Sequence, residues 1–181
     1  MIYVFLADGF EEVEAVTPID YLRRAGVDVA TVGVTGKTVT AAHNISFICD
    51  LDINEVDYSA MEGIVLPGGM PGTLNLENSA EVQAAIDYCC NNNLLIAAIC
   101  AAPSILGHKN ILKNKKAVCF PGFEADLYGA DVLTDKFSVT DGNIITAKGA
   151  GAASEFAFEL IRYLCDENIA QQIRSTVQTC Y

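Results

Sequence analysis

The sequence predicts one α/β domain in which helices cover both faces of a mostly parallel β-sheet. Short apolar runs alternate with segments of helical periodicity along most of the chain, which is typical of parallel strands joined by crossover helices. A chain of 181 residues can bury one sizeable hydrophobic core and is too short for two comfortable ones. We therefore expect a single domain over residues 1–181.

The expected elements follow one another in strand–helix–strand order. The first strand covers residues 2–7 and leads into a helix over 11–25, which ends at Gly26. Further strands are expected at 27–34, 63–66, 94–99, 117–120 and 144–147, a β-excursion over 37–49, a hairpin at 141–142, and helices from 78 or 79 to 90 and from 153 to 165. The strand at 94–99 is the most apolar, so we expect it at the centre of the sheet.

The charge balance limits the partners of the protein. Lys and Arg number 11 against 23 Asp and Glu, which gives a formal charge of −12. Nucleic acids and anionic membranes bind basic surfaces, so neither is expected as a partner. The apolar start of the chain is too short to span a bilayer and lacks the basic start of a signal peptide, which predicts a cytoplasmic protein.

The cysteines predict reduced thiols rather than a disulfide framework. The chain has Cys49, Cys89, Cys90, Cys100, Cys119, Cys165 and Cys180. Their odd number and the absence of C-x-x-C spacing support this prediction. Because the only histidines, His43 and His108, form no zinc-ligand spacing with them, no metal is expected. Cys89, Cys90, Cys119 and Cys165 lie in apolar patterns and are expected to pack in the core, whereas Cys180 is expected to be exposed.

The strongest signal for chemistry is Cys100, directly after the most apolar strand. A nucleophile elbow needs small residues two positions before and after the nucleophile, and Ala98 and Ala102 meet that need. Such a turn points the sulfur at a helix N-terminus, where the thiolate is favoured over the thiol. A packed core cysteine is the alternative, because free cysteine is among the most buried residue types.

Glu14 is the second candidate. It heads a helical stripe that otherwise looks buried and consists of Thr17, Pro18, Tyr21, Leu22 and Ala25. A buried carboxyl is costly unless it is protonated or well paired. Its acidic neighbours need no such explanation, because Asp8 and Glu11 have capping-box spacing and Glu12 suits the dipole of a helix start.

Gly68 and Gly69 follow the strand at 63–66 and form the third candidate. Glycines after a buried strand allow close backbone approach and can aim an amide at an anion, although an ordinary turn would also explain them.

The three candidates can meet in one crevice, because ligands of parallel sheets bind beyond the carboxyl ends of the strands. There a buried Glu14 with a raised pKa can donate a hydrogen bond to a Cys100 thiolate. The N–H groups of Gly69 and Ala101 are candidate donors to a developing oxyanion.

These motifs, in this order, resemble the ThiJ/PfpI family (also called the DJ-one family), and within it the branch of the parkinsonism-associated deglycase. The resemblance runs essentially from end to end. It is carried by the segments 7–14, 23–26, 66–69, 97–103, 149–151 and 155–157. It implies a flavodoxin-like three-layer sandwich, a homodimer with Cys49 near its seam, and no cofactor.

The resemblance also implies roles for individual residues. They are Cys100 as nucleophile and redox-sensitive thiol, Glu14 as its protonated partner, Gly68, Gly69 and Ala101 at the oxyanion and substrate site, and Arg24 near a dimer-side entrance. Relatives in this branch are reported as cofactor-independent glyoxalases, as deglycases, and as oxidative-stress sensors or chaperones.

Two departures from the family's patterns argue against proteolysis. The peptidase branch places a His directly after the nucleophile, where this chain has Ala101. Some deglycase relatives have a His where this chain has Phe120, and His108 forms no convincing pair with Cys100. Acylation by an amide substrate needs a base and a leaving-group acid, so a cysteine peptidase is only the third hypothesis.

Two hypotheses of different classes lead. The first is a glyoxalase or deglycase that acts on a small carbonyl substrate, a methylglyoxal-like 2-oxoaldehyde, through Cys100 and Glu14. The second is a redox-sensing homodimer or chaperone in which Cys100 is oxidised. The same thiolate suits both, so the residues leave both open.

Overall fold

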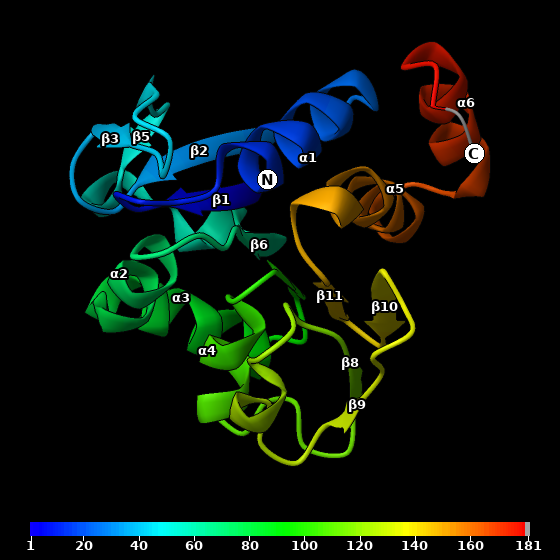
Figure 1. The fold of residues 1–181 in the computed structure, drawn as a ribbon. Helices are drawn as coiled ribbons and strands as arrows, with labels where there is room; N and C mark the ends of the chain where they lie inside the picture. Colours follow the sequence, from blue (N-terminus) through cyan, green and yellow to red (C-terminus); the bar gives the residue numbers. More distant parts are fainter. Residues whose placement is uncertain (180–181) are drawn as a thin grey trace.

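A seven-stranded sheet forms the centre of the structure (Figure 1). The computed structural model describes residues 1–179, so the expectation for Cys180 lies outside the described residues. The strand order is β10-β11-β7-β6-β1-β2-β5, and every neighbouring pair is parallel except β10 and β11. The strands are β1 (Ile2–Leu6), β2 (Val29–Gly33), β5 (Leu51–Asp52), β6 (Gly63–Leu66), β7 (Leu95–Ile99), β10 (Ser138–Asp141) and β11 (Ile144–Ala147). The most apolar strand, β7, was expected at the centre of the sheet; it lies in the interior, next to the middle strand β6.

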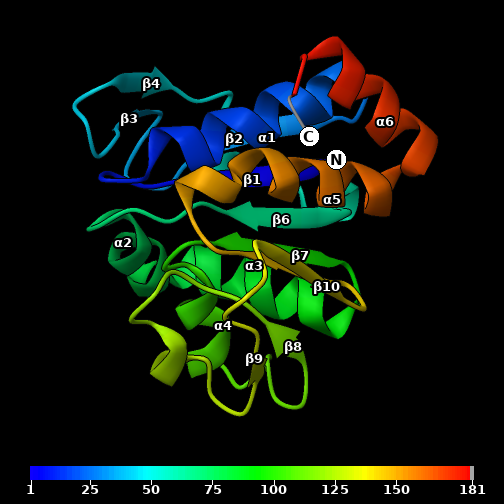
Figure 2. The same cartoon turned by 45° about the vertical axis from the view of Figure 1, so that its right-hand side comes forward.

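Helices cover both faces of this sheet, which gives three layers (Figures 1 and 2). On one face lie α1 (Glu12–Arg24) and α5 (Ala153–Leu164), with α6 (Glu167–Thr176) packed beside α5. On the other face lie α2 (Gly72–Asn78), α3 (Ala80–Asn91) and α4 (Pro103–His108). The predicted α/β sandwich is confirmed. Along residues 1–179, no helix is both long and apolar enough to cross a lipid bilayer.

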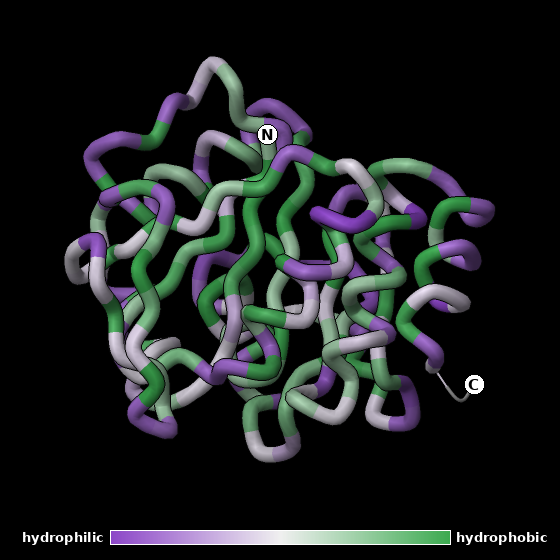
Figure 3. The backbone as a smooth tube through the Cα atoms, turned by 90° about the horizontal axis from the view of Figure 1, so that it is seen from above, coloured by the Kyte–Doolittle hydropathy of each residue, from purple (hydrophilic) through white to green (hydrophobic). Residues whose placement is uncertain are grey.

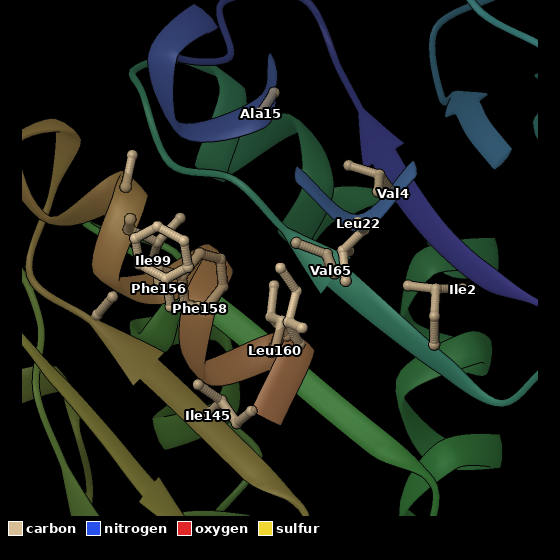
Figure 4. Packing of buried hydrophobic residues seen from close by; sticks show 14 of the residues in the cluster. Ile2, Val4, Ala15, Leu22, Val65, Ile99, Ile145, Phe156, Phe158 and Leu160 are labelled. Carbon is tan, nitrogen blue, oxygen red and sulfur yellow. The ribbon is translucent and has the colours of Figure 1, made fainter. Parts of the chain in front are cut away.

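Two hydrophobic cores result, one on each face of the sheet. Side chains of a strand alternate between its faces, so Val4 of β1 packs with α1 and α5, whereas Phe5 packs with α3. Figure 4 shows the first core, where Leu22, Phe158 and Leu160 approach the strands. The central strands are hydrophobic along their length (Figure 3), as expected for a sheet buried on both faces.

Most predicted elements are present, and their bounds differ from the predicted ones by one or two residues. The β-excursion is an antiparallel pair of its own, β3 (Thr38–Thr40) with β4 (Ser46–Ile48). The hairpin at 141–142 joins β10 to β11, as predicted. The strand predicted at 117–120 is wrong in extent: β8 is only Lys116–Ala117 and pairs with β9 (Asp131–Val132) outside the main sheet. Its continuation fails because the Val118 N–H donates to the Thr146 hydroxyl rather than to a strand.

Two helices, α2 and α6, were not predicted, and one predicted cap is wrong. Asp166 caps α6 by accepting a hydrogen bond from the Ile169 N–H, a signal that the sequence does contain. Ion pairs of Arg162 with Glu167 and of Glu155 with Arg174 then tie α5 to α6. The capping box at the start of α1 does not form, because the Asp8 carboxylate accepts the Thr40 N–H of the β3–β4 hairpin instead.

The cysteines fall into two groups. Cys89 and Cys119 are buried as predicted, and Cys49 is buried too. The prediction that Cys90 and Cys165 pack in the core is wrong, since both are exposed. Cys90 follows Cys89 on α3, so the helix turns it about 100° away from the core face. Cys165 lies one residue beyond the end of α5.

Truncation of Leu160 to alanine is expected to destabilise the protein by about 3 kcal/mol, because this fully buried side chain fills the core between α5 and the sheet. The free energy of unfolding, measured in urea by circular dichroism, tests this. Tyr163→Ala on the same helix is the matched control, because Tyr163 is exposed and its truncation is expected to change stability by less than about 0.5 kcal/mol. Equal losses in the two variants would contradict the packing described for α5.

Candidate active site

Cys100 stands at the tip of a sharp turn between β7 and α4. Its φ is 67°, in the left-handed region that residues other than glycine rarely adopt. Its N–H donates to the Ala147 carbonyl (2.9 Å), and its own carbonyl accepts the Phe120 N–H (2.8 Å). The turn is thus held from two sides, and the cysteine itself is only partly buried. Strained residues of this kind cluster at functional sites.

Glu14 comes to this turn from the first turn of α1. The residue is 1% exposed, and its Oε2 atom accepts the Gly68 N–H at 2.9 Å. Its carboxyl is also hydrogen-bonded to the Cys100 sulfur and to the backbone N–H of Ala150. The side chains of Glu14 and Cys100, 86 positions apart in the chain, therefore form a direct pair at the carboxyl ends of the strands.

Gly68 makes this pairing possible. A Cβ atom on Gly68 would lie 2.6 Å from the Cys100 Cβ and 2.8 Å from the Glu14 Oε2, so any side chain there would push the pair apart. Gly69 has a φ of 90° and packs against the backbone of residues 9–11, where a Cβ would lie 2.5 Å from the Glu11 nitrogen. Both glycines are therefore needed because other groups approach their backbone closely, which an ordinary turn would not require.

Burial and charge raise the pKa of both members of the pair. Burial raises the pKa of Glu14 to about 7, against the lowering effect of its hydrogen bonds to Cys100 and the Gly68 N–H. Burial and the charge of Glu14 raise the pKa of Cys100 to about 12, while the backbone N–H groups of Gly69 and Ala101 lower it. Above neutral pH, the pair therefore holds a single proton that the two side chains share.

The raised pKa of Glu14 agrees with the expected protonatable carboxyl, whereas burial and the charge of Glu14 oppose the expected thiolate at Cys100. The helix that follows Cys100 has only six residues, and its N-terminus does not outweigh burial and the adjacent carboxylate. The thiolate form arises when the proton moves from sulfur to carboxyl within the pair. Glu14 can accordingly act first as a base and then as an acid.

The amides at the site divide into two sets. The N–H groups of Gly69 and Ala101 hydrogen-bond the Cys100 sulfur, so both point at the position where a reacting atom would sit. The Gly68 N–H is taken by Glu14 and is therefore a positioning group for the carboxyl. Gly69 and Ala101 remain the donors available to an oxyanion.

Arg24 lies outside this cluster. It is the last residue of α1, ten positions after Glu14 and hence roughly 15 Å further along the helix. Its guanidinium pairs with Asp20 at 2.8 Å on the exposed surface. Its role at a dimer-side entrance stays a prediction, because it concerns a second protomer.

Both histidines are engaged away from the sulfur. The His108 Nδ1 lies 2.6 Å from Glu77, and its Nε2 lies 3.6 Å from Asp126. The His43 Nδ1 lies 2.8 Å from the Glu12 carboxylate, which also accepts the His43 N–H. Neither imidazole forms a Cys–His pair with Cys100.

Glu11, Glu12 and His43 are described residues whose donor types suit a metal ion, and their ligand atoms lie within 4.8 Å of one another. The hydrogen bonds between Glu12 and His43 account for this cluster without an ion. Sequence reasoning missed this pair and attributed Glu12 to the helix dipole. It also missed the hydrogen bond from the Ala150 backbone to Glu14, because the alanine side chain gives no sign of it.

The comparison with protein families settles the relationship. The model of the DJ-1/PfpI family matches residues 1–163. The chain belongs to the DJ-1/PfpI family. This confirms the resemblance inferred from the motifs, and the elbow cysteine, the buried glutamate and the paired glycines lie within the matched region.

Individual relatives agree with this placement. The chain is 32% identical to Drosophila melanogaster protein dj-1beta, over 98% of this chain and 96% of that protein. It is 27% identical to a protein named a deglycase from Pyrococcus abyssi, over 90% and 98% of the two chains. It is 34% identical to the DJ-1 homolog B of Arabidopsis thaliana, but spans only 39% of the length of that longer protein. The structure of Toxoplasma gondii DJ-1, oxidized, matches with a TM-score of 0.94 and 33% identity, over 99% and 98% of the chains.

Replacement of Glu14 by glutamine is expected to shift the titration of the Cys100 thiol to lower pH, by about one unit or more. The carboxylate beside the sulfur is one of the causes that raise its pKa, and glutamine removes the charge while keeping the shape. Thiolate absorbance near 240 nm, taken as the difference from the corresponding Cys100→Ser protein, measures this. A shift to higher pH would mean that a neutral Glu14 stabilises the thiolate, contrary to the effect of its charge described above.

Proposed function

We propose that this protein is a cofactor-independent glyoxalase of the deglycase type, which converts methylglyoxal-like 2-oxoaldehydes to 2-hydroxy acids. The observation that carries the proposal is the hydrogen-bonded pair of Glu14 and Cys100 beneath the amides of Gly69 and Ala101. This arrangement combines a nucleophile, a proton carrier and oxyanion donors. The deglycase name of the Pyrococcus abyssi relative supports the same class of chemistry.

The reaction begins with attack of the Cys100 sulfur on the aldehyde carbon. Glu14 takes the thiol proton as the carbon–sulfur bond forms, and the aldehyde oxygen becomes the hydroxyl of a hemithioacetal once it is protonated. The Gly69 and Ala101 N–H groups are placed to stabilise the negative oxygen that precedes protonation. Because the pair holds a single proton, Glu14 is a base at this step without any other residue.

The second half of the reaction moves hydrogen between two adjacent carbons. Glu14 removes the proton from the former aldehyde carbon and returns a proton to the ketone carbon. The first carbon is thereby oxidised to a thioester and the second is reduced to an alcohol. Water then cleaves the carbon–sulfur bond, which releases the 2-hydroxy acid and restores the thiol. The net change is addition of one water, with no external oxidant or reductant.

Turnover of methylglyoxal to lactate by the wild type, Cys100→Ser and Glu14→Gln in metal-free buffer tests the proposal. Each substitution is expected to lower kcat/KM at least about a hundredfold, because one removes the nucleophile and the other the proton carrier. For the wild type, kcat/KM should rise with pH through about 7, as Glu14 loses its proton and becomes a base. If the wild type converts methylglyoxal no faster than free cysteine does, the proposed glyoxalase function is refuted.

A redox sensor or chaperone is the second candidate. It is favoured by the similarity to the structure of Toxoplasma gondii DJ-1, described as oxidized, and by the amides of Gly69 and Ala101, which suit sulfinate oxygens as well as an oxyanion. Peptide mass spectrometry after mild peroxide treatment separates Cys100 oxidation from that of exposed Cys90 and Cys165. Oxidation spread evenly over the three would argue against a dedicated sensor.

We also propose a homodimer that covers the outer surface of α1 and the β3–β4 hairpin. Val13, Val16 and Ile48 are exposed there, Ile48 by 82%, beside a hollow of about 200 Å³ that Phe47 also lines. A charge introduced by Ile48→Asp is expected to convert the dimer to a monomer in sedimentation velocity experiments. Tyr163→Ala, which removes an exposed ring from α5, is the control and should stay dimeric. A monomeric wild type would refute the proposed homodimer.

A further inference from the structure

Two adjoining hollows lie beside the Glu14–Cys100 pair. The first has a volume of about 320 Å³, and Phe120, Phe137, Gly149 and Ala150 are among the residues that line it. The second, of about 330 Å³, shares the Phe137 wall and continues toward Ser154 and Glu155 at the start of α5. We call the two together the aromatic groove, because the rings of Phe120 and Phe137 form its apolar walls.

The groove begins at residues that contact the pair, although Glu14 and Cys100 are not themselves among its lining residues. The Phe120 N–H donates to the Cys100 carbonyl, so one aromatic wall is fixed directly to the elbow. Gly149 separates the Phe120 ring from Glu14: a Cβ there would lie 3.2 Å from the ring and 3.8 Å from the Glu14 Oε1. The Ala150 N–H bonds the Glu14 carboxyl from the floor of the groove.

The other wall is held by backbone anchors. The Phe137 carbonyl accepts the Lys148 N–H at 2.9 Å, and the Lys148 ammonium donates to the Thr134 carbonyl at 2.7 Å. The Phe137 side chain is nevertheless 65% exposed, and that of Phe120 is 46% exposed. Two anchored, uncovered aromatic rings beside a nucleophile form a surface that gains free energy when an apolar group covers it.

We propose that the aromatic groove binds the side chain of the substrate and selects 2-oxoaldehydes with an aryl or bulky apolar group over methylglyoxal. This inference rests on the proposed glyoxalase function and adds the substrate class. A methyl group leaves nearly all of the groove to water, whereas an apolar cavity of about 150 Å³ already accommodates benzene. With the aldehyde carbon at Cys100, the ketone substituent points past Gly149 into the groove. For phenylglyoxal, addition of one water gives mandelate by the same internal hydrogen transfer.

The test compares kcat/KM for phenylglyoxal and for methylglyoxal in the wild type, Phe137→Ala and Tyr163→Ala. The wild type is expected to prefer phenylglyoxal. Phe137→Ala is expected to lower the phenylglyoxal-to-methylglyoxal ratio about tenfold, because the aryl group loses its aromatic contact. Tyr163→Ala removes an exposed ring remote from the groove and should leave the ratio within twofold of the wild type. Using the ratio of two substrates cancels any general loss of folded or active protein.

A second measurement separates this inference from the glyoxalase activity. Alkylation of Cys100 by N-benzyl iodoacetamide and by N-methyl iodoacetamide, followed by peptide mass spectrometry, reports the groove without turnover. The benzyl reagent is expected to react faster, and Phe137→Ala should remove the difference. If neither aldehyde is turned over but this benzyl preference is found, the glyoxalase proposal fails and the groove remains an apolar subsite.

Two results would overturn the inference while leaving the glyoxalase intact. One is Cys100-dependent turnover with a substrate ratio that is the same in the wild type and Phe137→Ala. The other is a change from dimer to monomer in Phe137→Ala, which would identify the exposed ring as part of an interface between protomers. Phe120→Ala provides an independent check on the wall nearer the sulfur, and an unchanged ratio there would equally contradict the proposal.

Discussion

The site depends on one constraint, the lack of space for a side chain at residue 68. The Glu14 carboxyl meets the Cys100 sulfur only because Gly68 presents no atoms between them, and its N–H fixes the carboxyl by a direct hydrogen bond. Burial of that carboxyl, the direct hydrogen bond to sulfur and the sharing of one proton all follow from this approach. Gly68 therefore controls the geometry of the pair, although it has no side chain of its own.

The fold brings distant segments to the same place through the order of its strands. β1, β6, β7 and β11 are adjacent and parallel, so the turns after them open at one edge of the sheet. Glu14 arrives after β1, the glycines after β6, the cysteine after β7, and Ala150 after β11. The strand order therefore brings these residues close together, and the turns after the strands orient them.

The sequence predicted the parts of the protein that depend on local pattern or strand-end position. The sandwich, the elbow around Cys100 and the burial of Glu14 belong to this group. It did not predict α6, which is held to α5 by the ion pairs of Glu155 with Arg174 and of Arg162 with Glu167. The raised pKa of Cys100 was also not predicted, because it depends on the balance between burial and charge in three dimensions. Cys90 was misassigned because an apolar neighbourhood in sequence does not fix which side of a helix a residue occupies, and Cys165 because it lies just beyond the end of α5.

The left-handed backbone at Cys100 has a consequence for how the protein balances stability against reactivity. A side chain in this conformation costs on the order of 1 kcal/mol or more, which a glycine would not incur. The chain is therefore less stable with any side chain at this position than with glycine. The hydrogen bonds of Cys100 with the Ala147 carbonyl and the Phe120 N–H hold the turn against that strain. Selection for folding alone would favour glycine at this position, so a cysteine here is expected to benefit the protein through its sulfur.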